Sequence, residues 1–217
     1  FSGDSAAAIR NEGAIQALGG DVFMIARSVE NSGSISAPQG TVGLAAGDQV
    51  QLVQSGNERM SVLAGGTANA TTAVGVNNVG TIEAVSAELK AAGGNIYALA
   101  VNNGGVIRAT GIVNENGRIY LRASGGNIQN SGTLSARNAD GSGGSVVLDG
   151  GHNATAAATV INSGTIEARG DSAGTKGGHV EVLGDHVGLF EDALVDVSGD
   201  AGGGEALIGG DFQGNNA

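Results

Sequence analysis

The sequence predicts an all-β protein, a right-handed parallel β-helix (solenoid) with loop insertions. Three observations lead to this fold class. A motif with asparagine and glycine at fixed places recurs along the chain, apolar residues alternate with other residues after most copies, and no 3.6-residue helical period persists. Glycine supplies 41 of the 217 residues, and only 3% are aromatic. Frequent tight bends around a narrow aliphatic interior account for both numbers.

The first motif reads apolar-x-Asn-x-Gly-x-apolar-x-Ala. Its copies begin at Ile9, Val29, Val76, Val101, Ile128 and Val160, and a degenerate seventh begins at Leu189, with Glu191, Ala193, Val195 and Val197 in the corresponding places. Equivalent residues of stacked coils lie about 4.8 Å apart, so buried asparagine amides can hydrogen-bond in a ladder. Glycine at the bend permits a positive φ. We therefore expect Asn31, Asn103 and Asn130 to line up along one edge.

A second motif, Gly-x-apolar-x-apolar-x-Ala or Gly, follows most copies of the first. Its copies start at Gly20, Gly40, Gly94, Gly117, Gly144, Gly178 and Gly204. Apolar residues at every second position lie on one face of a strand. The shortest period between bends is 20 residues and the longest is 47. A fixed bend with loops of variable length is typical of a solenoid whose insertions bulge outward.

The interpretation leaves some local choices open. Segment 86–93 is compatible with a short helix capped by Ser86 or with a strand that points Ala87, Leu89 and Ala91 inward, and its surroundings favour the strand. A left-handed hexapeptide helix, a calcium β-roll and a propeller each require a repeat that this chain lacks. The predicted insertions are 54–75, 85–92, 137–143, 151–159 and 169–177.

The charge and composition of the chain argue against some classes of binding partner. The net charge of −11 repels nucleic acid and anionic lipid, and no apolar run approaches the roughly 18 residues of a membrane span. We therefore expect no nucleic-acid partner and no membrane insertion. The absence of cysteine suits export of an unfolded chain. The chain starts at Phe1 without a signal sequence, so we interpret residues 1–217 as a single β-helix segment, a fragment of a longer protein.

Several phrases resemble the filamentous-haemagglutinin type of two-partner-secretion exoprotein, from about residue 9 to 214. They are Asn31-Ser-Gly-Ser-Ile-Ser-Ala37, Gly40-Thr-Val-Gly-Leu-Ala-Ala-Gly-Asp48, Asn162-Ser-Gly-Thr-Ile-Glu-Ala168, Gly177-Gly-His-Val-Glu-Val-Leu-Gly-Asp185 and Gly203-Gly-Glu-Ala-Leu-Ile-Gly-Gly-Asp-Phe-Gln-Gly214. The resemblance implies the adhesive shaft of a secreted or cell-surface protein of a Gram-negative bacterium. It also implies export through an outer-membrane β-barrel partner. The receptor or glycan stays open, and some such proteins are shafts of contact-dependent toxins.

Two segments near the C-terminal end contain residue types that can bind metals, although both are compatible with ordinary surface positions. His179-Val-Glu181 has the His-x-Glu spacing of zinc deaminases, and strand alternation puts both side chains on one face. That chemistry also needs Pro-Cys-x-x-Cys, which is absent, and His186 lies at an odd offset along a strand. Asp196-x-Ser198-x-Asp200 only faintly resembles a calcium loop, because Ala201 and Leu207 replace the required Gly and Glu. We predict no metal and no cofactor.

Catalysis is the competing hypothesis, because polysaccharide lyases and hydrolases also use parallel β-helices. Asp185, Asp192, Asp196 and Asp200 are the carboxylates from which a general acid and base would be built. Their spacing does not favour catalysis over surface charge, and aromatic platforms for sugars are scarce. We therefore predict no catalytic residues and no enzyme. Asn69 and Asn153 begin glycosylation sequons in predicted outward loops.

Overall fold

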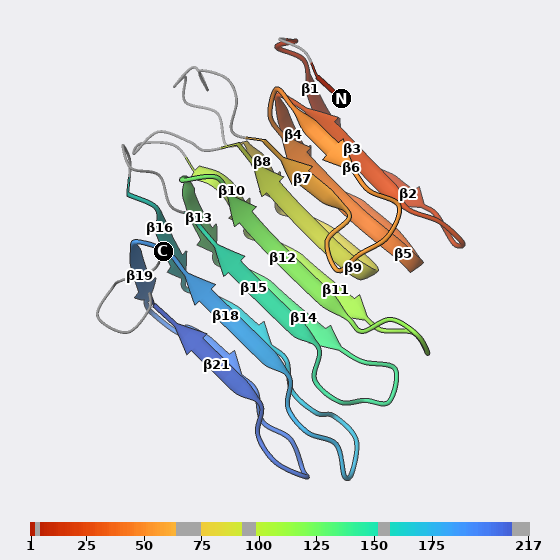
Figure 1. The fold of residues 1–217 in the computed structure, drawn as a ribbon, viewed down its shortest axis with the longest axis vertical. Coiled ribbons are helices and arrows are strands. Elements are labelled where there is room, and N and C mark those ends of the chain that lie inside the picture. The colour runs from red at the N-terminus through yellow and green to blue at the C-terminus, as the bar shows by residue number, and fades with distance from the viewer. Residues whose placement is uncertain (3–4, 64–74, 93–98, 152–156, 210–217) are drawn as a thin grey trace.

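The computed structural model describes residues 1–2, 5–63, 75–92, 99–151 and 157–209. Within these ranges the chain forms strands and no helix, and almost all strand pairs are parallel. Strands far apart in the sequence lie side by side, and the colours in Figure 1 follow one another along the stack. The all-β prediction is confirmed, and the arrangement is consistent with a parallel β-solenoid.

The first face of the stack, face A, is a sheet of seven parallel strands, one from each coil. Equivalent residues of successive strands lie side by side: Val29 beside Val76, Val76 beside Val101 and Val101 beside Ile128. The strands in stacking order are β1 (Ala8–Asn11), β4 (Ser28–Asn31), β8 (Val76–Asn78), β10 (Leu99–Asn103), β13 (Asn127–Asn130), β16 (Thr159–Asn162) and β19 (His186–Leu189).

The other two faces share one sheet of 12 strands, because β5 (Ser34–Ala46) and β9 (Thr81–Ala91) run through both. Their first halves belong to face B and their second halves to face C. Face B also contains β2 (Ala14–Gln16), β11 (Val106–Thr110), β14 (Thr133–Arg137), β17 (Thr165–Glu167) and β20 (Leu194–Asp196). Face C also contains β3 (Val22–Ala26), β12 (Arg118–Ala123), β15 (Ser145–Asp149), β18 (His179–Leu183) and β21 (Glu205–Ile208).

Aliphatic side chains from all three faces fill the interior in rows. One row on face C consists of Leu44, Leu89, Leu121 and Leu148, each fully buried beside the same residue of the next coil. The alternation in the sequence sets these rows, since every second side chain of a strand points inward. At about 25 cal/mol per Å² of apolar area, such rows are the main source of stability.

The predicted asparagine ladder is confirmed. Nδ2 of each asparagine donates to Oδ1 of the next, with N–O distances of 2.7–2.8 Å. The last amide, Nδ2 of Asn162, donates to the carbonyl oxygen of Gly164 at 3.0 Å. Each interior amide is thus both donor and acceptor in a dry environment, where an unpaired amide would be costly. The ladder consists of Asn11, Asn31, Asn78, Asn103, Asn130 and Asn162.

The expected reason for the glycine at the bend is wrong. The glycines that follow the ladder asparagines are not among the described residues with positive φ. Instead, a Cβ atom built on Gly132 would lie 2.0 Å from the carbonyl oxygen of Gly105, and one on Gly105 would lie 2.1 Å from that of Gly80. The backbone of each coil therefore packs directly on the backbone of its neighbour, and any side chain would separate them. The other bends of this kind are at Gly33, Gly80 and Gly164.

The seventh copy of the first motif is out of phase in the sequence interpretation. The register pairs Val160 with Val187 and Asn162 with Leu189, so that copy begins at Val187 and not at Leu189. Farther on, Val195 lies beside Ile166, as expected. Two additional residues in the bend explain the difference, and Glu191 accommodates them with a φ of 55°.

The insertions are partly as predicted. Segments 137–143 and 169–177 lie between strands of faces B and C, as expected, except that Arg137 is the last residue of β14. Segment 85–92 is not an insertion, because nearly all of it forms the second half of β9, with Ala87, Leu89 and Ala91 buried as the strand interpretation predicted. In the motif copy at Gly94, residues 94–98 lie outside the described ranges. Ala100 of that copy belongs to β10 on face A.

Candidate functional site

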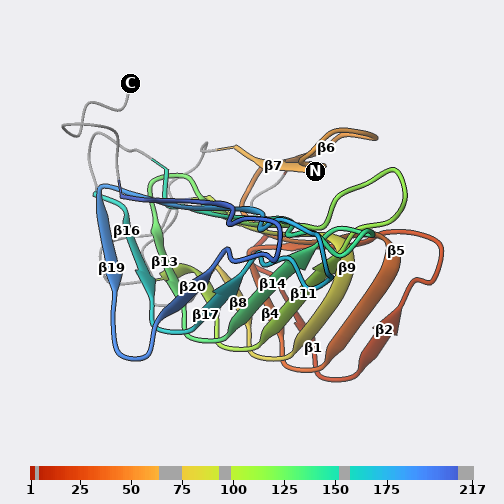
Figure 2. The ribbon, with the colours of Figure 1, turned by 90° about the horizontal axis from the view of Figure 1, so that it is seen from below.

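A β-hairpin lies on the outside of face C and forms a network of buried charges with the sheet beneath it. It accounts for the longest period, and it consists of β6 (Val50–Leu52) and β7 (Met60–Val62), paired antiparallel. Figure 2 shows both strands lying outside the stack. Apolar side chains beneath it, Val50 and Met60, are buried against Ala45. The described part of the predicted insertion 54–75 is therefore an ordered element packed on the sheet.

A buried ion pair lies under the hairpin. The Glu88 side chain is fully buried and the Lys90 side chain is 5% exposed. The Glu88 carboxylate accepts hydrogen bonds from the backbone N–H groups of Arg59 at 2.6 Å and Met60 at 3.0 Å, and Lys90 Nζ lies 3.0 Å from it. Desolvating two charges is costly unless further hydrogen bonds satisfy them. Because the hairpin backbone supplies those bonds, the pair is satisfied only while the hairpin is docked.

Glu58 extends the network to the next coils. Its carboxylate accepts from Lys90 Nζ at 2.6 Å and forms a bidentate pair with Arg122, at 3.0 Å from Nε and 2.9 Å from Nη2. Arg122 Nη1 also donates to Asp149 of the following coil. The cations of Lys90 and Arg122 lie 6.0 and 5.7 Å from the centre of the Tyr120 ring, within the range of cation–π attraction. Glu58, Glu88, Lys90, Tyr120, Arg122 and Asp149 are named the hairpin charge cluster below.

The protonation equilibria reflect these contacts. Burial raises the pKa of Glu58, but the hydrogen bonds and charges of Lys90 and Arg122 outweigh burial, and the pKa lies below its usual value. Burial lowers the pKa of Arg122, but the hydrogen bonds and charges of Glu58 and the charge of Asp149 raise it by more, so the net shift is upward. Burial raises the pKa of Tyr120. The shifts of Glu58 and Arg122 therefore both favour the charged forms that pair with each other.

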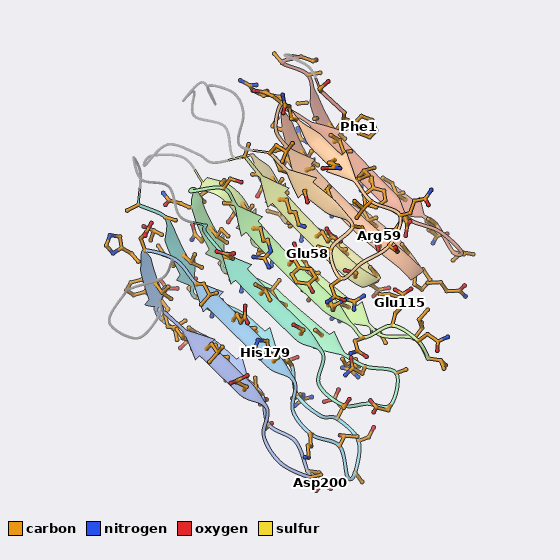
Figure 3. The ribbon with its side chains drawn as sticks, viewed as in Figure 1. Phe1, Glu58, Arg59, Glu115, His179 and Asp200 are labelled. Atoms are coloured by element: carbon orange, nitrogen blue, oxygen red, sulfur yellow. The ribbon has the colours of Figure 1, made fainter. Side chains whose placement is uncertain are left out.

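A second set of contacts fixes the tip of the hairpin to the first coil. Arg59 Nη2 lies 2.9 Å from Asp21, and its guanidinium carbon lies 5.9 Å from the centre of the Phe23 ring. Figure 3 shows Glu58 and Arg59 together over the sheet. The hairpin thus forms polar contacts with the first, third and fourth coils of face C and packs on Ala45 of the second. The fifth coil joins the network only through the bond between Arg122 and Asp149.

The opposite surface of the hairpin faces solvent. Gln51 and Ser61 are exposed, and two apolar residues just beyond the strands, Val53 and Leu63, are 42% and 47% exposed. An open groove along β6 is lined in part by Gln51, Leu52 and Leu63. The hairpin therefore exposes both apolar and polar groups to solvent, while its other side is packed against face C.

The candidate metal residues His179 and Glu181 do lie on one face, as predicted. His179 Nε2 is 2.7 Å from Glu181, and Nδ1 is 3.1 Å from Glu205 of the next coil. His186 belongs to β19 on face A, a different sheet. In the ranges that the structure describes, no group of three or more histidine, aspartate and glutamate side chains is arranged to hold a metal ion. His179 lies on the outside of β18 (Figure 3), and its contact with Glu181 is a polar pair on that surface.

The four aspartates that could supply a catalytic acid and base are spread over three bends: Asp185 between β18 and β19, Asp192 between β19 and β20, and Asp196 and Asp200 at the connection from β20 to β21. Asp185 accepts from the backbone N–H of Ala158 at 2.7 Å, next to face A. Asp196, at the end of β20, accepts from the N–H of Ser198 at 2.9 Å, and this turn lowers the pKa of its carboxyl. Asp200 accepts from the N–H of Gly174 at 2.7 Å. Three of the four therefore accept hydrogen bonds from backbone N–H groups of separate turns. Segment 196–200, which faintly resembles a calcium loop in sequence, begins with a turn in which Asp196 accepts from Ser198.

Two buried polar side-chain atoms within the described ranges have no hydrogen-bond partner. They are Ser86 Oγ and Arg118 Nε, on neighbouring strands beside the hairpin. Neither atom is open to solvent, so neither presents a site to a large ligand. Asn69 and Asn153 of the sequons lie outside the described residues. None of the described segments is a helix long and apolar enough to cross a membrane.

The sequence interpretation did not find the hairpin charge cluster. A signal was present, since Glu88, Lys90, Tyr120, Arg122 and Asp149 occupy outward positions of strands whose inward residues were recognised. Their adjacency became visible only when the register across the longest insertion was known. The partner Glu58 comes from the insertion, where no periodicity fixes the position of a residue.

Comparisons with known proteins add no relative. No protein-family model matches the chain, and the search of curated proteins gives no match. The class that the fold itself defines is an all-β protein of stacked parallel strands.

Proposed function

We propose that this chain is a right-handed parallel β-helix from the adhesive shaft of a secreted or cell-surface protein of a Gram-negative bacterium. The single observation that carries the proposal is the hairpin of β6 and β7, which is fixed to a stiff stack and exposes its other surface. Binding residues are commonly found on loops that a rigid scaffold positions. The filamentous-haemagglutinin-like phrases of the sequence support the same class, with an outer-membrane β-barrel as export partner.

The right-handed winding is part of this proposal. Each coil leaves face A, passes through faces B and C, and returns to the strand next to its starting strand. Crossover connections between parallel strands of one sheet are right-handed in the great majority of proteins.

Weak contacts repeated along a shaft suit the proposed role. A single hairpin presents only a small mixed surface, so its own affinity is low. Many copies displayed together would bind with much higher avidity. The receptor chemistry that fits Gln51, Val53, Ser61 and Leu63 is an uncharged surface with apolar patches, such as an abiotic apolar surface or the apolar face of a glycan.

Beads that carry the chain at high density test adhesion. Their attachment to polystyrene, immobilised neutral glycans and cultured epithelial cells is compared with that of albumin-coated beads. The test variant carries Val53→Ser with Leu63→Ser. The control variant carries Val79→Ser with Val113→Ser, two comparably or more exposed apolar residues away from the hairpin (49% and 93%).

We expect wild-type and control beads to attach alike and the hairpin variant to attach about tenfold less, which corresponds to a total change of about 1.4 kcal/mol in the apparent binding free energy. Equal losses in both variants, or wild-type attachment no higher than albumin, would refute the adhesive role of the hairpin. The competing enzyme hypothesis is tested in parallel by incubating the chain with a panel of acidic polysaccharides. Release of reducing ends or unsaturated products would support the enzyme hypothesis in place of the adhesive one.

A further inference from the structure

The two buried side-chain atoms that have no hydrogen-bond partner within the described ranges belong to neighbouring residues. They are Ser86 Oγ on β9 and Arg118 Nε on β12, and the register of these parallel strands places the two residues side by side. Because such strands lie about 4.8 Å apart, one small ligand between the side chains can contact both atoms. Buried polar groups are rarely left unpaired, so the adjacency of these two indicates a shared partner.

Residues of the hairpin cover this place from outside. Arg59 pairs with Asp21 of the first coil at 2.9 Å, and Asn57 Oδ1 accepts a hydrogen bond from Nη1 of Arg118, in the fourth coil, at 3.3 Å. Ser86 belongs to the third coil, between these two contacts, and is 2% exposed. The unpartnered atoms each expose less than 1 Å². The space beside them is therefore closed, and it suits a ligand of one atom better than sulfate or phosphate.

Arg118 is a cation without a carboxylate partner. Among the described residues no carboxylate oxygen lies within 4.0 Å of its guanidinium, and its neighbours in the row, Ser86 and Ser145, are uncharged. The carboxylates of the hairpin charge cluster are held by Lys90 and Arg122 instead. A charge removed from water is costly unless it is paired, so the site favours an anion. The other arginines all have a carboxylate partner; they are Arg10, Arg27, Arg59, Arg108, Arg122, Arg137 and Arg169.

The chemistry of the two unpartnered atoms requires an acceptor. A guanidinium N–H only donates, and a serine hydroxyl can donate as well. Water would accept both bonds, but it would also bring two hydrogens, for which the guanidinium offers no acceptor. An anion only accepts, and its hydrogen bond to a charged donor is stronger than one between neutral groups. We propose that Ser86 and Arg118 bind a single chloride ion beneath the tip of the hairpin.

The chloride site is coupled to the position of the hairpin. The ion neutralises Arg118, whose Nη1 holds Asn57, and it is enclosed only while the hairpin is docked. A ligand that binds one state of a protein stabilises that state, so chloride favours the docked hairpin. The inference rests on the underside of the hairpin and does not require the adhesive function of its exposed surface.

Hydrogen exchange of the Met60 amide, which donates to Glu88 at 3.0 Å, reports the docking of the hairpin. Exchange in the wild-type chain is compared in sodium chloride, sodium bromide and sodium gluconate at equal ionic strength, since gluconate is too large for the site. A ligand of the docked state slows exchange by a factor of one plus the ratio of its concentration to Kd, which is about elevenfold at ten times Kd. We expect a slowing that saturates with chloride or bromide and is absent with gluconate.

Two serine variants test whether the response comes from this site. Ser86→Ala removes one donor, and Ser145→Ala, on the other side of Arg118, is the matched control. We expect Ser145→Ala to keep the wild-type response and Ser86→Ala to weaken the apparent chloride affinity about tenfold. Equal responses of the two variants, or a wild-type response no greater in chloride than in gluconate, would overturn the proposal.

Crystals of the wild-type chain grown in bromide locate the ion directly and need no variant. Anomalous scattering should show a bromide ion between Ser86 Oγ and Arg118 Nε. A water molecule or a protein side chain in that place would overturn the proposal, and this result is independent of whether Ser86→Ala folds.

Discussion

Alanine at Gly132 isolates the close backbone contact that joins one coil to the next. The Cβ atom would lie 2.0 Å from the carbonyl oxygen of Gly105 and 2.8 Å from its amide nitrogen. Contacts below 3.0 Å essentially never occur for a real Cβ atom, and here both atoms belong to backbone that cannot rotate away. The coils must therefore separate by about the missing ångström at this bend.

The cost follows from what the separation disturbs. Forcing an extra carbon into a packed interior costs about 1–3 kcal/mol. The displaced carbonyl of Gly105 also accepts the N–H of Thr133 at 2.9 Å, and weakening that bond adds about 0.5–1.5 kcal/mol. We expect Gly132→Ala to lower the free energy of unfolding by about 2–4 kcal/mol.

Gly13→Ala is the matched control. Gly13 occupies the same place in the motif, but it belongs to the first coil, and a Cβ there meets no atom within 4 Å. Neither Gly13 nor Gly132 has a positive φ, so backbone strain does not distinguish them. Because alanine restricts the unfolded chain, we expect Gly13→Ala to be neutral or stabilising by up to about 1 kcal/mol.

Urea unfolding followed by circular dichroism near 218 nm measures both variants against the wild type, with midpoints compared at equal slope. A change in slope would mark separate melting of coils, as stacked repeats can show, and hydrogen exchange at the bend then supplies the local free energy. Equal effects of the two substitutions would refute the contact argument. So would a large loss at Gly13, because it would point to glycine's conformational freedom.

Three further changes test the ladder, the core and the hairpin. Asn103→Ala leaves the buried amides of Asn78 and Asn130 without one partner each. We expect the free energy of unfolding, measured in urea, to fall by about 2–4 kcal/mol. A fall below about 0.5 kcal/mol would contradict a structural role of the ladder. Leu121→Ala should cost about 2–5 kcal/mol by the same measurement, because the side chain is fully buried; tolerance would argue against one continuous core. Lys90 and Arg122 hold the pKa of Glu58 below its ordinary value of 4.5. The stability that these pairs supply is therefore present above that value and lost as the pH falls through the lower folded value. Glu58→Gln should flatten this acid dependence and speed proteolytic cleavage of the hairpin at neutral pH, whereas an unchanged acid profile would show that the pairs contribute nothing.

The repeat itself allowed much of the fold to be predicted. Alternating apolar residues gave the strands of most coils, and the spacing of Asn31, Asn103 and Asn130 gave the ladder that their amides form. These features depend on short-range pattern and on identical surroundings in each coil, so the sequence carries them directly. Where the spacing changed, at Leu189 and at segment 85–92, the interpretation failed, because pattern alone does not set the register across an insertion.

The sequence by itself determined that strands stack around a thin aliphatic interior with asparagines at one bend. Only the tertiary structure decided why the bends need glycine and how the surface is organised. Gly132 is required because of a carbonyl of the previous coil, an atom 27 positions earlier in the chain. Glu58 meets Arg122 across 64 positions. Both contacts arise from close approach between separate coils, and such distances are set by packing in three dimensions.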